Sequence, residues 1–139
     1  MKTLLLASLA ALAVAAPAEA ATLYVQLDGV RAGGGRLHVS VQSRAEFMQQ
    51  SGTAGSLVDA PTAGTHRFTY QVPAGEYAVS VWHDDNGNGA FDSNEQHIPL
   101  DGWTMVNAEQ IRAEPTFDQV KTAVGETPAS IRLAMIYGR

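Results

Sequence analysis

An acidic, asparagine-rich segment between positions 84 and 95 has the residue types and spacing of a calcium-binding loop. Counted from its first aspartate, side-chain oxygens stand at loop positions 1, 3, 5, 9 and 12, and glycine stands at position 6. These residues are Asp84, Asn86, Asn88, Asp92, Glu95 and Gly89. Calcium takes about six to eight oxygen ligands, so alternate side chains must turn inward while the glycine lets the backbone wrap around the ion. With the carbonyl of Ala90 at position 7, the spacing predicts a Ca²⁺ site.

The surroundings of this loop leave other interpretations open. Asn-Gly and Gly-Asn steps form turns readily, so a metal-free connection between strands is one alternative. The loop follows a strand pattern, so it is not an EF-hand. His83 shares the parity of the buried valines before it, which predicts a hydrogen-bonded histidine at the edge of the core instead of a metal ligand. We expect His83, Asp85 and Trp103 to support the site or contact a ligand, and Phe91 to point toward the core.

Composition and charge exclude several functional classes. The formal net charge is -5, and seven acids but no Lys or Arg lie between Arg67 and Arg112. Nucleic-acid binding is not expected, because phosphate contacts need a basic face. The chain has no cysteine, which excludes disulfides, thiolate metal sites and a cysteine nucleophile. There is no G-x-S-x-G motif either, and we assign no catalytic residue.

The N-terminus has the layout of a secretory signal peptide. Lys2 precedes an apolar run of 13 residues, and Ala18 and Ala20 form a small-x-small cleavage site. A membrane-spanning helix needs about 20 apolar residues, so this run is too short to be one. We therefore expect residues 1–20 to be removed and residues 21–139 to form one domain, periplasmic or secreted, with no transmembrane segment after cleavage.

The remaining chain alternates apolar and polar residues with a period of two, which is typical of strands with one buried face. Such rows cover residues 23–27, 37–41, 68–72, 77–81 and 131–137, and the glycines at 33–35 make the first two a predicted hairpin. Capping-box patterns at Ser43 and Thr116 predict short helices over 44–50 and 117–123. Residues 96–115 show neither the period of two of a strand nor the period of about 3.6 residues of a helix. We expect an all-β fold, an antiparallel β-sandwich with one or two short helices and a long ordered loop.

Several segments of the sequence resemble the motifs of a known bacterial family. The run from Pro73 to Gly89, then Ile98-Pro99, Gly102-Trp103 and Glu114 to Asp118, is similar to the exported family called domain of unknown function 2141. The resemblance implies a secreted or periplasmic β-sandwich and no established reaction. Glu95 is not typical of the family at its position, so its role rests on spacing alone. The strand entry from Pro73 to Tyr77 also resembles prealbumin-like modules. The expected sandwich is therefore immunoglobulin-like or prealbumin-like.

These observations lead to one expected function and one alternative. We expect a non-enzymatic exported domain in which a structural calcium ion orders a loop that is presented to an unknown protein or glycan partner. The alternative is a carbohydrate-binding module or a metal-assisted hydrolase that uses the acidic loop together with His83 and Trp103. The alternative requires a pocket that contains both side chains.

Overall fold

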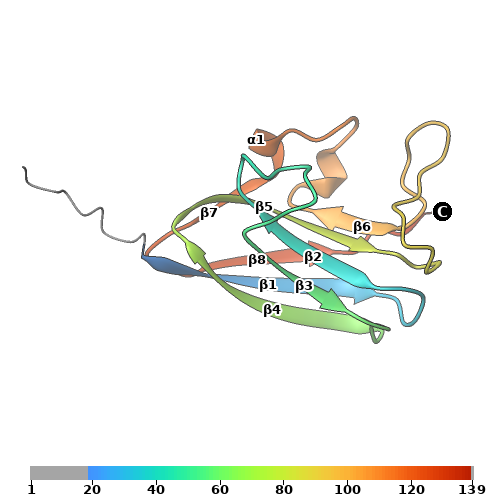
Figure 1. Ribbon diagram of the computed structural model, residues 1–139, viewed down its shortest axis with the longest axis horizontal. Coiled ribbons are helices and arrows are strands. Elements are labelled where there is room, and N and C mark those ends of the chain that lie inside the picture. The colour runs from blue at the N-terminus through green and yellow to red at the C-terminus, as the bar shows by residue number, and fades with distance from the viewer. Residues whose placement is uncertain (1–18, 139) are drawn as a thin grey trace, which may run out of the picture.

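The computed structural model describes residues 19–138, which form two β-sheets packed face to face (Figure 1). The strands are β1 (Ala20–Val30), β2 (Leu37–Gln42), β3 (Ala54–Val58), β4 (Gly64–Pro73), β5 (Gly75–His83), β6 (Gly102–Met105), β7 (Lys121–Val124) and β8 (Ala129–Ala134). A 3-10 helix, η1 (Ala108–Gln110), and a short α-helix, α1 (Phe117–Val120), lie between β6 and β7. The predicted all-β sandwich is confirmed.

The pairing of the strands differs from the predicted hairpin. One sheet has the order β4-β1-β8, and the other has the order β3-β2-β5-β6 with β7 also paired to β5. Consecutive strands β1 and β2 therefore lie in different sheets, and the glycine-containing connection crosses between them. Most pairs are antiparallel, but β1 and β8 run parallel, with Leu23 opposite Ala129.

The core lies between the inner faces of the two sheets. Alternate residues of β1 and β5 lie in this core, as the period of two predicts: Leu23, Val25 and Leu27 from β1, and Val79 and Val81 from β5. The predicted inward rows of β2, β4 and β8 contribute to the same cluster. Burial of these side chains is the main stabilising contribution.

The helical predictions are partly confirmed. Helix α1 begins after Thr116, whose backbone N–H donates to Oε1 of Gln119 at 2.9 Å. The segment 44–50 forms turns instead of a helix, although the backbone N–H of Ser43 donates to Glu46. Residues 96–115 are not a single loop, because they contain β6 and η1.

The N-terminal predictions lie mostly outside the described residues, which begin at Glu19. Strand β1 starts at Ala20, so the predicted cleavage site falls at its first residue. Within residues 19–138 no helix is long and apolar enough to cross a membrane.

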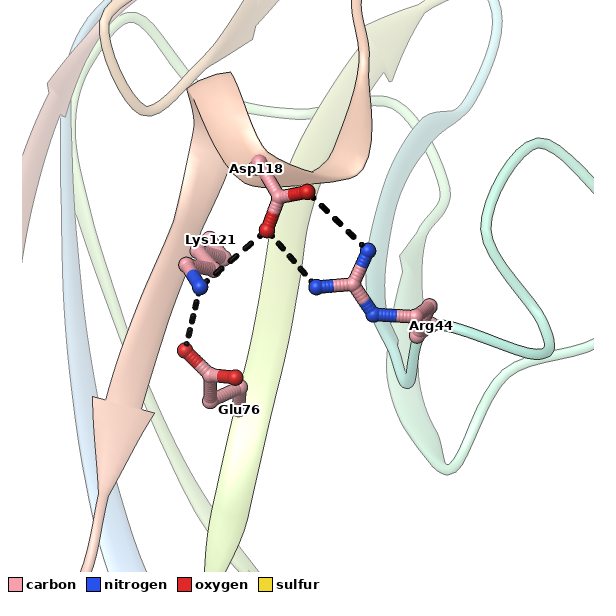
Figure 2. Close-up of polar contacts among 4 residues, drawn as sticks. All are labelled: Arg44, Glu76, Asp118 and Lys121. Atoms are coloured by element: carbon pink, nitrogen blue, oxygen red, sulfur yellow. Dashed lines mark hydrogen bonds and ion pairs between the residues drawn. The ribbon is translucent and has the colours of Figure 1, made fainter.

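An ion-pair network joins α1 to the neighbouring strands (Figure 2). The Asp118 carboxylate accepts from Nη2 of Arg44 at 2.6 Å and from Nζ of Lys121 at 3.1 Å, and Lys121 also pairs with Glu76 at 2.8 Å. These contacts lower the pKa of Asp118, the Arg44 hydrogen bond most and Lys121 next. The Glu76 hydrogen bond is the main reason that the pKa of Lys121 is raised.

This network predicts a salt- and acid-sensitive contribution to stability. The pKa of Asp118 is depressed in the folded state. The carboxylate therefore stabilises the fold fully at pH values above the pKa of an unfolded aspartate, about 3.9, and this stabilisation is lost as the pH falls toward the folded-state pKa. Asp118→Asn should therefore melt at a lower temperature than the wild type at pH 7 in low salt. The difference should shrink toward pH 2, because the unfolded state then binds a proton at Asp118 more readily than the folded state does. It should also shrink in 1 M salt, because the four groups are exposed or half-buried and salt screens them.

The matched control is Asp59→Asn, which removes a single exposed pair with Arg36. We expect a smaller change in melting temperature for this variant. A difference between Asp118→Asn and wild type that stays constant from pH 7 to pH 2 would contradict the assignment.

Candidate functional site

The candidate site is the connection between β5 and β6, which projects from the end of the sandwich where the C-terminus lies (Figure 1). It starts with Asp84, which is only 5% exposed. The carboxylate of Asp84 accepts the backbone N–H groups of two consecutive residues, with Oδ1 bonded to Asn88 at 3.1 Å and Oδ2 bonded to Gly89 at 2.8 Å. Asp84 therefore folds the chain back on itself, with Gly87 and Gly89 in the left-handed conformation.

Two asparagine side chains of the loop converge on one carboxylate oxygen. Oδ2 of Asp92 accepts from Nδ2 of Asn86 and from Nδ2 of Asn88, each at 2.7 Å. The amide oxygens of both asparagines accept backbone N–H groups two residues ahead, which is the geometry of an Asx turn. The structure thus links Asp84, Asn86, Asn88 and Asp92 in one hydrogen-bonded network.

The other two predicted ligands are not part of this network. Glu95 is exposed and takes part in none of the side-chain hydrogen bonds found within residues 19–138. Ala90 contributes its N–H to the network through Asn88, and no described contact involves its carbonyl. In the part of the chain that the structure describes, no group of three or more His, Asp or Glu side chains is placed to hold a metal ion. The four side chains of the network are two carboxylates and two amides, and the amides present their NH₂ groups, not their oxygens, to Asp92.

A buried aspartate fastens the far end of the loop to the sheet. Asp101 is 1% exposed, and its Oδ2 accepts from Nε1 of Trp82 at 2.9 Å and from the backbone N–H of Asp92 at 3.0 Å. Leu100 N–H also donates to the carbonyl of Asp92. Sequence reasoning gave Asp101 no role, although an acid immediately before a strand in a segment rich in apolar residues was a usable signal.

The predicted inward orientation of Phe91 is wrong. Its side chain is 51% exposed and packs edge-on against Trp82, with ring centroids 6.1 Å apart. On the other side, His38 stacks on Trp82 at 4.4 Å. The loop is therefore anchored on the outer face of its sheet, because the inner face is already filled by β-strand side chains.

The glycine-rich connection between β1 and β2 supports the first residues of the loop. Gly35 N–H donates to the carbonyl of Asp84 at 2.7 Å, and Asp84 N–H donates to the carbonyl of Arg36. A Cβ atom at Gly34 would clash with the backbone of Asp85, and this glycine has φ of +70°. These glycines serve a close backbone approach between two segments, a role that their interpretation as a hairpin turn missed.

His83 is a structural residue on the inner face. It is 0% exposed, with Nε2 3.0 Å from the carbonyl of Gly33 and Nδ1 2.8 Å from the hydroxyl of Tyr137. A carbonyl oxygen only accepts, so Nε2 carries the proton and the Tyr137 hydroxyl donates to Nδ1. That hydroxyl also accepts from Arg31 N–H at 2.9 Å. The predicted hydrogen-bonded histidine is confirmed.

His83 and Trp103 do not share a pocket. Trp103 lies opposite Trp82 in the β5–β6 ladder, and His83 lies opposite Gly102 one residue away. Because successive side chains alternate across a sheet, Trp103 shares the outer face with Trp82, whereas His83 is inside. The half-buried Asp85 takes part in none of the side-chain hydrogen bonds within residues 19–138. The candidate side chains are therefore distributed over two faces.

Comparison with known proteins gives one match. No significant similarity was found among curated proteins or among solved structures. A family model described as an uncharacterised protein conserved in bacteria, domain of unknown function 2141, matches residues 25–132. The matched range runs from β1 to β8 and includes the whole acidic loop. The chain therefore belongs to the family of domain of unknown function 2141.

Proposed function

We propose that this protein is a non-enzymatic, exported β-sandwich whose loop of residues 84–95 binds a structural calcium ion and presents the following segment to a partner. The observation that supports the proposal is the convergence of Asn86 and Asn88 on Asp92 beside the Asp84 carboxylate. Four oxygen-bearing side chains brought together within nine residues is what a compact oxygen-ligand loop requires.

The hydrogen bonds of Asp92 suggest how an ion would be accommodated. Two amide NH₂ groups point at one carboxylate oxygen, and their partial positive charge takes the place that a cation would occupy. Rotating each amide by 180° would turn its oxygen toward the same point, because an amide carries a donor on one side and an acceptor on the other. The rotation would also break the hydrogen bond that each amide oxygen accepts from the backbone, so ion binding would have to offset that loss. The Asp84 carboxylate keeps lone pairs free beyond the two N–H groups it accepts.

The affinity should be modest. Glu95 would have to move inward from an exposed position to complete the ligand set, and ordering a long side chain costs conformational entropy. Extracellular calcium modules of this kind have dissociation constants of about 10⁻⁴ to 10⁻³ M. Such an ion would stabilise the loop and the start of β6 and would not act as a signal.

Calcium should raise the melting temperature. At about 10 mM calcium, these dissociation constants correspond to about 1.4–2.7 kcal/mol of stabilisation. For a domain of this size that is a rise of roughly 5–10 °C over the same protein in chelator, measured by differential scanning calorimetry. Asp92→Asn should abolish the rise, because it removes a carboxylate at the point of convergence.

The matched control is Glu126→Gln, which removes an exposed carboxylate outside the loop and should leave the calcium response unchanged. Identical melting curves with calcium and with chelator would contradict the proposal. The proposal would also fail if Asp92→Asn responded to calcium as the wild type does.

The hydrolase or carbohydrate-binding alternative has less support at this loop. It needed His83 and Trp103 in one concavity, and these side chains lie on opposite faces of the sheet. We therefore keep the structural calcium loop as the proposed function.

A further inference from the structure

The outer face of the three-stranded sheet carries an ordered array of polar side chains. In the register of β4, β1 and β8, Gln26 lies opposite both Arg67 and Arg132. Two residues earlier in β1, Tyr24 lies opposite both Thr69 and Ser130. Leu23, Val25 and Leu27, which alternate with Tyr24 and Gln26 along β1, are core residues. The six polar or aromatic side chains therefore share the opposite, solvent-exposed face of the sheet.

This array lines a groove of about 330 Å³. It is lined by residues of the central strand β1 and of the flanking strands β4 and β8. Tyr24 is 46% exposed, so its ring is available to a ligand. The volume is at the small end of the range for small-molecule sites, about 300–1,000 Å³, which suits one or two sugar rings.

The two arginines differ in how they are held. Nε of Arg132 donates to Asp28, which also accepts from Thr65 and Gln26. This arrangement fixes Arg132 through Nε, and none of the hydrogen bonds within residues 19–138 uses its two terminal nitrogens. Arg67 takes part in no ion pair or side-chain hydrogen bond in the same part of the chain. A protein of net charge -5 thus has two arginines that line one groove, one of them ion-paired with Asp28.

We propose that this groove binds an acidic saccharide, with one sugar ring on Tyr24 and its carboxylate between Arg67 and Arg132. An aromatic ring offers an apolar face to the C–H groups of a pyranose, and arginine binds carboxylates in a planar, bidentate way. Gln26, Thr69 and Ser130 supply donors and acceptors for hydroxyl groups. The site lies on the other sheet from the acidic loop and does not depend on calcium.

A binding titration tests this proposal. ¹⁵N-labelled protein is titrated with trigalacturonate, and in parallel with the neutral trisaccharide of galactose. We expect a dissociation constant of about 1 mM for the acidic sugar, with shifts at the backbone of Val25, Phe68 and Ile131, which line the groove. Arg67→Gln and Tyr24→Ala should each weaken binding about tenfold or more. Both side chains are exposed, so both variants should melt like the wild type.

Arg112→Gln is the matched control, because Arg112 bonds only to nearby carbonyls outside the groove and should bind like the wild type. Absence of binding at about 10 mM would overturn the proposal. Equal binding of the neutral sugar would overturn the role of the arginines. Equal shifts with free acetate, or unchanged binding by Tyr24→Ala, would overturn the sugar site. Calcium removal should not change the result, which separates this test from that of the proposed function.

Discussion

Asp101→Ala is expected to lower the free energy of unfolding by about 3 kcal/mol and to release the loop of residues 84–95 from the sheet. The variant leaves the indole N–H of Trp82 and the backbone N–H of Asp92 without their acceptor. Each unsatisfied donor costs about 1–3 kcal/mol when it stays buried, and hydrogen bonds to a charged acceptor are at the strong end. Urea denaturation followed by tryptophan fluorescence measures both the stability and the environment of Trp82.

Asp101→Asn provides the control for this variant. Its side-chain oxygen still accepts from both donors, so it should lose less stability than the alanine variant. In Asp101→Ala, hydrogen exchange at Asp92 should also become faster, because that N–H loses its partner. If the alanine variant unfolds at the same urea concentration as the wild type, Asp101 does not anchor the loop.

The inward rows of the sandwich were predictable from alternation, but the pairing of the strands was not. A period of two determines which face of a strand is buried, and the structure buries the predicted rows of β1, β2 and β5. The same period does not say which strand lies next to which. Residues 31–36 are long enough either to close a hairpin or to cross between sheets, and the closeness of Gly34 to Asp85 favours the crossing.

The loop itself was predictable because its information is local. Asp84, Asn86, Asn88 and Asp92 lie within one short segment, and a tight turn brings alternate side chains together whatever the fold around it. Asp101 and the glycines at 34 and 35 support the loop from outside that segment. Their roles depend on which strands end beside the loop, and this follows from the tertiary structure.

His83→Ala should be among the most destabilising single substitutions outside the aliphatic core, with a loss of about 3–5 kcal/mol. The variant removes a fully buried ring that lies between Gly33 and Tyr137, and it leaves a cavity. It also leaves the carbonyl of Gly33 and the hydroxyl of Tyr137 without their partner. Burial raises the pKa of Tyr137 further above neutrality, so in the variant its hydroxyl remains a donor without the Nδ1 acceptor.

Two further variants separate a structural role of His83 from a ligand-binding one. Tyr137→Phe should lose about 1–3 kcal/mol, because it breaks the bond to Nδ1 and leaves Arg31 N–H unpaired. The two losses should be less than additive in a double-mutant cycle, because the residues share one hydrogen bond. His97→Asn changes an exposed histidine with φ of +60°, a conformation that asparagine tolerates, and should stay within about 0.5 kcal/mol of wild type. A His83→Ala variant as stable as His97→Asn would contradict the structural role, since a buried, doubly bonded ring cannot be removed without cost.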